Sequence, residues 1–77
     1  MRIQAIVAHD RAVVITAMRR IIRRGDMGRA PRWAVETITM GDYARIGPPI
    51  AGVSAYNCYR LTERGEQYLA EATRQGL

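Results

Sequence analysis

The sequence predicts an α+β fold, in which one domain spanning residues 1–77 combines about three helices with a short β-hairpin or strand pair. Three observations lead to this prediction. Residues 10–24 repeat apolar side chains at helical spacing, residues 56–61 are rich in strand formers, and residues 63–75 follow a helix-capping threonine. A chain of 77 residues accommodates one domain. The core of a domain this small seldom supplies more than about 3–5 kcal/mol.

The first helix is expected over residues 10–24. Asp10 is a favoured N-cap residue, and Gly25 suits the left-handed position that ends many helices. The predicted apolar face consists of Val14, Ala17, Met18, Ile21 and Ile22. Ile3 and Val7 extend this stripe, so the helix could begin near residue 3, and a short strand over residues 2–8 is the alternative.

Residues 25–32 are predicted to form a loop, because two glycines and a proline fall within eight residues. Trp33 follows, and two roles are open to it. It could stack on a base or anchor an interface, but in a chain without phenylalanine we favour it as the main core aromatic. Residues 33–40 contain strand formers, whereas Pro31 could open a short helix, so this segment is ambiguous.

A second helix is favoured over residues 40–46. Thr39 and Asp42 have the spacing of a capping box, and Ile38 and Tyr43 have that of a hydrophobic staple. The alternative is a hairpin that turns at Gly41 and Asp42.

The last third of the chain predicts a strand followed by a helix. No element is assigned to residues 48–57, in which two prolines and a glycine disfavour regular structure. Residues 56–61 are expected to form a strand, and Thr62 is expected to cap a helix over residues 63–75 that ends at Gly76.

Positive charge is concentrated in one segment. The net charge is +5, and all twelve basic residues are arginine. Residues 11–32 contain seven arginines against Asp26 alone, a net charge of +6, so the rest of the chain sums to −1. Such a patch either remains a solvated face or binds an anionic partner. The candidate binding residues are Arg19, Arg20, Arg23, Arg24, Arg29 and Arg32.

The residues needed for catalysis are missing from the sequence, so we expect no enzyme. His9 and Cys58 are single residues far apart in the chain, and the carboxylates have no acid–base or metal-binding spacing. No metal or cofactor is implied. Cys58 is interpreted as a half-buried small apolar residue, and His9 as a surface or helix-entry residue.

The cellular compartment is predicted from two kinds of segment, a membrane span and a signal peptide, that the sequence does not show. No run reaches the ~20 apolar residues of a membrane span. The apolar stretch near Met1 is short and interrupted by Gln4, unlike a signal peptide. We therefore expect a cytoplasmic protein that makes no membrane contact.

Two segments resemble winged-helix regulators of bacteria. The run Tyr-Arg-Leu-Thr-Glu-Arg-Gly-Glu-Gln-Tyr-Leu at residues 59–69 is similar to their junction between wing strand and last helix. Residues 38–47 are similar to the first helix of a helix-turn-helix. The resemblance implies DNA binding and transcription regulation. It also implies that residues 48–58 hold the recognition helix and wing, although these residues contain no arginine or lysine.

Two functions from different classes therefore remain. The first is a small basic nucleic-acid-binding regulator, with duplex DNA as the favoured partner, bound through the arginine-rich helix and loop. The second is a protein-binding modulator or inhibitor, of the kind that phages or plasmids encode, which docks its arginines on an acidic surface of a larger partner. A homodimer formed through Trp33 or the last helix is compatible with both.

Overall fold

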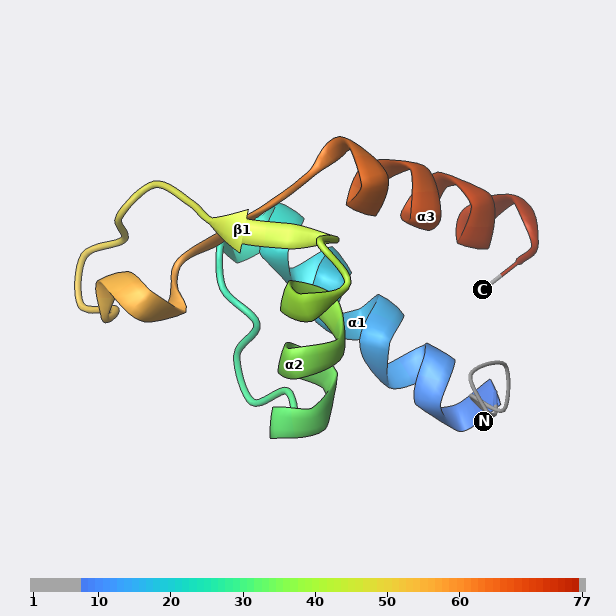
Figure 1. The fold of residues 1–77 in the computed structure, drawn as a ribbon, viewed down its shortest axis with the longest axis horizontal. Coiled ribbons are helices and arrows are strands. Elements are labelled where there is room, and N and C mark those ends of the chain that lie inside the picture. Colours follow the sequence, from blue (N-terminus) through green and yellow to red (C-terminus); the bar gives the residue numbers. More distant parts are fainter. Residues whose placement is uncertain (1–7, 77) are drawn as a thin grey trace.

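The computed structural model describes residues 8–76, and the part described is an α+β domain (Figure 1). Its helices are α1 (Ala8–Arg24), α2 (Arg32–Met40) and α3 (Glu63–Arg74). Strands β1 (Ala44–Ile46) and β2 (Tyr59–Leu61) form an antiparallel hairpin, and a short 3-10 turn, η2 (Ala55–Asn57), lies in the connection between them. The predicted fold class, three helices with a two-stranded sheet, is confirmed.

Helix α1 lies at the centre of the domain and packs against α2, β2 and α3. The core lies between these elements, and Met18 of α1 and Ile38 of α2 are fully buried in it. The connection between the two strands extends away from the helices, at the left of Figure 1. Within residues 8–76, no helix is long and apolar enough to cross a bilayer.

Helix α1 begins at Ala8, two residues before the predicted start, so the prediction that Asp10 is its N-cap is wrong: Asp10 lies in the first turn, where a carboxylate is favoured by the helix dipole. The helix ends at Arg24, and Gly25 adopts the expected left-handed backbone with φ of 81°. The alternative of a strand over residues 2–8 is wrong for Ala8, which is helical, while residues 2–7, and with them a helix start near residue 3, lie outside the described part of the chain.

The buried face of α1 differs from the predicted one at two positions. Ile15 is buried, whereas Ile22 is 66% exposed. The physical reason is that the neighbouring elements cover the middle of α1 but leave a groove open at its last turn, and Ile22 lines that groove.

The helix predicted over residues 40–46 is wrong. Helix α2 ends at Met40, and residues 44–46 form β1 instead. The expected capping threonine, Thr39, lies inside α2, and its hydroxyl donates to the carbonyl oxygen of Val35 at 2.9 Å. Pairing with residues 59–61 stabilises the extended form of residues 44–46, and no cap signal nearby indicates that pairing. The alternative of a hairpin turning at Gly41 and Asp42 is also wrong, because this turn joins a helix to a strand.

Trp33 is 41% exposed, so the prediction that it is the main core aromatic is wrong. Helix α2 turns Ala34 and Ile38 into the core, and Trp33 falls on another face of the same helix. Tyr43 and Tyr68 pack against the core instead, with ring centroids 5.3 Å apart.

Strand β2, at residues 59–61, is shorter than the strand predicted over residues 56–61. The register pairs Ala44 with Leu61, Arg45 with Arg60, and Ile46 with Tyr59. Residues 55–57 form η2 because the hydroxyl of Ser54 accepts a hydrogen bond from the amide of Tyr56. Cys58 is fully buried rather than half-buried, because it lies where this turn meets the hairpin.

Helix α3 has the predicted cap. The hydroxyl of Thr62 accepts a hydrogen bond from the amide of Gly65 at 3.1 Å and donates one to the carbonyl oxygen of Asp42 at 2.6 Å. The cap therefore also ties α3 to the turn before β1. The helix ends at Arg74, one residue before the predicted Gln75, and Gly76 has a φ of 81°.

Candidate functional site

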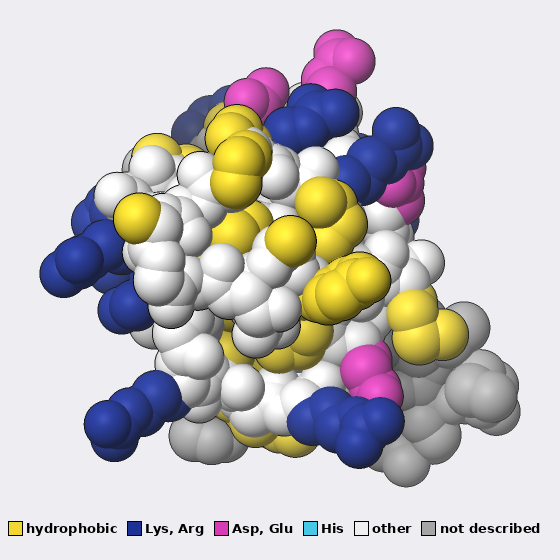
Figure 2. Space-filling model, turned by 90° about the vertical axis from the view of Figure 1, so that its left-hand side faces the viewer, with side chains coloured by type: hydrophobic (Ala, Val, Ile, Leu, Met, Phe, Trp, Pro, Cys, Tyr) yellow, Lys and Arg dark blue, Asp and Glu magenta, His cyan; other side chains and the backbone are white. Residues whose placement is uncertain are grey.

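The arginines singled out from the sequence do not form one continuous block. Figure 2 shows basic side chains in separate groups around the rim of the face that carries the connection between the strands. Some of the six candidates share grooves with one another, while others take part in contacts within the domain. Their positions therefore separate structural arginines from those available to a partner.

Arg20 is mainly structural. Its Nε donates to the carboxylate of Asp26 at 2.6 Å, and its side chain is only 38% exposed. The same carboxylate accepts from the amide of Gly28 at 2.8 Å, so the ion pair holds the turn that follows α1. Gly28 has a φ of 58°, and a β-carbon there would overlap the guanidinium of Arg20. Arg20 therefore fixes the loop on which Arg29 is carried.

Arg19 and Arg32 also have partners. Arg19 donates to the hydroxyl of Thr73 at 3.4 Å, across the contact between α1 and α3. Arg32 donates to Glu36 at 3.2 Å on the surface of α2, with its side chain 90% exposed. Exposed ion pairs of this kind contribute little to stability, so Arg32 could exchange Glu36 for another anion at low cost.

Three of the predicted arginines meet at a groove along α1, which we call the α1 groove. Arg20, Arg23 and Arg29 line it, and it has a volume of about 460 Å³. The rest of its lining is largely apolar and comes from α1 and the following loop: Ala12, Val13, Ala17, Met27, Ala30 and Pro31. No acidic residue of the described chain lines it.

A second groove, the α1-end groove, surrounds the last turn of α1. Arg23 and Arg24 line it together with Arg60 from β2, and its volume is about 360 Å³. Ile22, Pro48 and Tyr59 supply apolar surface, and Glu66 is the acidic residue in the lining. Among residues 8–76, Arg23, Arg29 and Arg60 make no ion pair and no side-chain hydrogen bond.

The third groove, the hairpin groove, was missed by the sequence analysis. Arg45, Arg60 and Arg64 line it with Asp42 and Glu63, and its volume is about 380 Å³. Arg45 and Arg60 are exposed and directly opposite each other in the hairpin register. Like charges in that position oppose strand pairing. The sequence contained no signal for this pair, because their segments are neutral or slightly acidic overall and the register comes from the fold.

Neighbouring groups, an acid for Arg45 and a ring and a carbonyl for Arg64, hold two members of the hairpin groove in place. Arg45 binds both carboxylate oxygens of Asp42, at 2.9 and 3.2 Å, and these hydrogen bonds lower the pKa of Asp42. Arg64 lies over the Tyr43 ring, 4.5 Å from its centroid, and donates to the carbonyl oxygen of Gly41 at 2.8 Å. Arg60 has no such partner among the described residues, so its charge is the most available of the three.

Helix α2 presents a further exposed surface. Trp33 and Met40, 41% and 84% exposed, lie seven residues apart on its outward face, and Thr37 lies between them. The first turn of α2 has no acidic residue and no side-chain cap, so its amide groups leave a partial positive charge beside Arg32.

No family model, curated protein or solved structure matches this chain. Within residues 8–76 there is also no group of three histidine, cysteine, aspartate or glutamate side chains that could hold a metal ion. The three arginine-lined grooves and the exposed face of α2 are the features from which a function can be argued.

Proposed function

We propose that this domain binds nucleic acid and serves as a small DNA-binding regulator. The observation that carries the proposal is the set of unpaired, exposed arginines around the end of α1, namely Arg23 and Arg29 with Arg60 beside them. Arginine presents a planar fork of donors that matches phosphate oxygens. Unpaired charges at this density repel one another, and a phosphate backbone would remove that repulsion.

An exposed aromatic side chain beside Arg32 also supports a nucleic-acid partner. Trp33 directly follows Arg32 in the first turn of α2 and is 41% exposed. Aromatic rings beside arginines can stack on bases while the arginines contact phosphates. Solubility alone would not require an exposed tryptophan beside a basic loop.

The winged-helix resemblance is retained within this proposal, in an altered form. In the order α1, α2, hairpin and α3, the helix directly before the hairpin is α2. If the hairpin serves as a wing, α2 takes the place of the recognition helix, with Arg32, Trp33 and Thr37 exposed on its surface. This assignment replaces residues 48–58, which contain no arginine or lysine.

A second candidate, an acidic protein partner, is favoured by one observation. The α1 groove has an apolar floor in addition to its arginines. An acidic peptide with apolar side chains would use both, whereas a phosphate backbone uses only the charges. Winged-helix scaffolds support both kinds of binding, so fold does not decide between them.

The test measures the affinity for fluorescent nucleic acid, single-stranded and duplex, as the salt concentration rises. The logarithm of the binding constant should fall linearly with the logarithm of salt, with a slope of about 0.7 per phosphate contact for single strands and about 0.9 for duplex. The double variant R23A/R29A should flatten that slope by about 1.4–1.8, because two contacts are lost.

The matched control is R11A/R74A, which removes the same charge at positions outside the grooves. Arg11 donates to Gln75, Arg74 pairs with Glu71, and neither lines any of the three grooves. This variant should keep the wild-type slope. Absence of binding to either form at about 50 mM salt and tens of micromolar protein, weaker than ordinary non-specific affinity, would rule out the proposal. In that case the acidic-peptide candidate would be tested next.

A further inference from the structure

We infer that the preferred partner is a single strand of nucleic acid, which follows one bent path through the α1 groove, the α1-end groove and the hairpin groove. The inference rests on the proposed function and specifies which form of nucleic acid is bound. It is carried by three observations: how the grooves connect, how their path bends, and what lines them.

The three grooves form a series because neighbouring grooves share an arginine. Arg23 lines both the α1 groove and the α1-end groove. Arg60 lines both the α1-end groove and the hairpin groove. Each groove contains three arginines in all, and Arg23 and Arg60, which join them, have no ion-pair partner among residues 8–76. A phosphate backbone moving along the series would therefore meet available positive charge at each junction.

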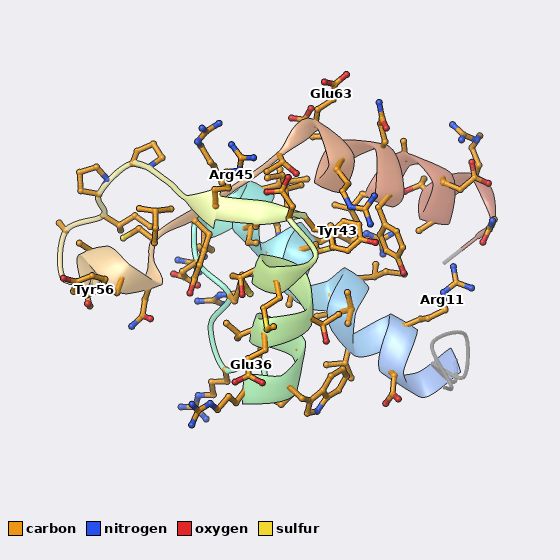
Figure 3. The ribbon with its side chains drawn as sticks, viewed as in Figure 1. Arg11, Glu36, Tyr43, Arg45, Tyr56 and Glu63 are labelled. Atoms are coloured by element: carbon orange, nitrogen blue, oxygen red, sulfur yellow. The ribbon has the colours of Figure 1, made fainter. Side chains whose placement is uncertain are left out.

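The path through these grooves is not straight. The α1 groove lies against the side of α1, next to the loop that leads to α2. The hairpin groove lies on the outer face of the hairpin, where Arg45 and Arg60 point away from the core, while Tyr59 and Leu61 pack inward. Figure 3 places Arg45 on the other side of the hairpin from Glu36 of α2, and Pro31 of the α1 groove directly precedes α2. The hairpin thus separates the two outer grooves, and a ligand in both must pass around the end of α1.

Stiffness decides which form of nucleic acid can follow such a path. Duplex DNA has a persistence length of about 50 nm. The whole domain measures 36 × 26 × 18 Å, so a duplex would contact one side and leave the grooves on the other side empty. A single strand is flexible enough to turn around the end of α1. Contacts in all three grooves are therefore available to a single strand and unavailable to a duplex.

The linings provide surface for bases as well as for phosphates. The α1 groove has an apolar floor, and the α1-end groove contains Tyr59 and Pro48 beside the exposed Ile22. Proteins that bind single strands combine basic grooves with aromatic and apolar contacts to unpaired bases. Ile22, 66% exposed, adds apolar surface to a groove that arginines also line.

The experiment compares the affinities of the full chain for oligothymidylates of 5, 10 and 20 nucleotides and for a 20-base-pair duplex at about 0.1 M salt. Affinity for the single strands should rise with length and level off within the range of about 4–16 nucleotides. The 20-mer should bind more tightly than the duplex. The variant R45A/R60A should weaken 20-mer binding about 25-fold, because each lost contact with a slope of about 0.7 is a factor of about 5 at this salt. Binding of the 5-mer and of the duplex should change less than about 3-fold.

Two further variants keep the test decisive. R60A alone leaves the Arg45–Asp42 pair intact and should still weaken 20-mer binding about 5-fold, even if the double variant does not fold. R11A/R74A removes the same charge as R45A/R60A and should preserve the preference for the single strand. Tighter binding of the duplex, or an equal effect of R45A/R60A and R11A/R74A on the 20-mer, would overturn the inference while leaving the proposed function in place. No binding to any of the probes would instead remove the proposed function.

Discussion

Arg20, Arg23 and Arg29 line one groove, yet their surroundings give them different roles. Arg20 is held by Asp26 and organises the loop, whereas Arg23 and Arg29 have no partner among the described side chains. A substitution of Arg20 would therefore disturb folding and binding together. Substitutions of Arg23 and Arg29 would report binding alone, which is why the proposed test uses these two.

The ion pair between Arg20 and Asp26 predicts a dependence of stability on pH. The hydrogen bond from Arg20 lowers the pKa of Asp26, burial opposes this, and the amide of Gly28 lowers the pKa further. A carboxyl group whose pKa is lower in the folded state contributes stability above its unfolded value of about 3.9 and loses it as the pH falls through the folded value. D26N should therefore be less stable at pH 7, and its stability should fall less steeply below about pH 4.

Urea unfolding of the wild type and D26N at pH 7, 5, 4 and 3 measures this effect. Asp42 and Glu71 also have lowered pKa values, but both remain in the variant, so the difference between the two proteins isolates Asp26. If the free energies of unfolding of the two proteins ran parallel from pH 7 to pH 3, the ion pair between Arg20 and Asp26 would not contribute to stability.

At the scale of elements, the contact between α3 and the turn before β1 determines how the second half of the chain packs. Thr62 links the two by capping α3 and by donating to the carbonyl oxygen of Asp42. Gly65, in the first turn of α3, is buried, and a β-carbon there would overlap the carbonyl oxygen of Tyr43. A glycine inside a helix normally costs stability, and this one permits a close backbone approach.

G65A tests this contact, because helix propensity predicts an increase in the free energy of unfolding and packing predicts a decrease. Propensity alone would stabilise α3 by about 0.8–1.0 kcal/mol. Overlap with a backbone carbonyl, which cannot rotate aside, typically costs about 1–3 kcal/mol. We expect packing to dominate, so that G65A loses up to about 2 kcal/mol in urea unfolding.

The control for this prediction is A70G at an exposed position of the same helix. It should lose about 1 kcal/mol, since only propensity changes there. If G65A were more stable than the wild type by the amount that A70G loses, the close approach of Gly65 to the carbonyl oxygen of Tyr43 would be contradicted.

For the whole molecule, the decisive quantity is the small size of the core. A domain shorter than about 70–80 residues seldom gains more than about 3–5 kcal/mol from its core. In this domain α1 supplies several of the buried side chains and packs against all three other parts of the fold. The same helix carries the arginines of the α1 groove, so its position determines both stability and the arrangement of the site.

M18A and I22A, both changes on the predicted apolar face of α1, should have very different effects. Met18 is fully buried, and its truncation should cost about 2–5 kcal/mol, which is enough to leave much of the protein unfolded at 25 °C. Ile22 is 66% exposed, and its truncation should change stability by less than about 0.5 kcal/mol. Circular dichroism during urea unfolding measures both. Equal losses would mean that Ile22 is part of the core.

Local signals in the sequence were sufficient for the first and last helices. The end of α1 at Arg24, the left-handed Gly25, the cap at Thr62 and the end of α3 before Gly76 all depend on contacts within one helical turn, which neighbouring residues reveal. The segment of high positive charge was also visible, since charge can be counted along the chain. These features establish a basic α+β domain with its arginines on and after the first helix.

Other features depended on pairing and packing between distant segments, which the tertiary structure alone decided. Residues 44–46 became a strand because they pair with residues 59–61, and this interaction outweighs the local capping signals that favoured a helix. The same register brings Arg45 opposite Arg60, and the packing of α2 turns Trp33 outward. The sequence by itself thus determined where most of the charge lies along the chain. The fold decided which arginines share a groove, because a groove is formed by side chains from elements that are far apart in sequence.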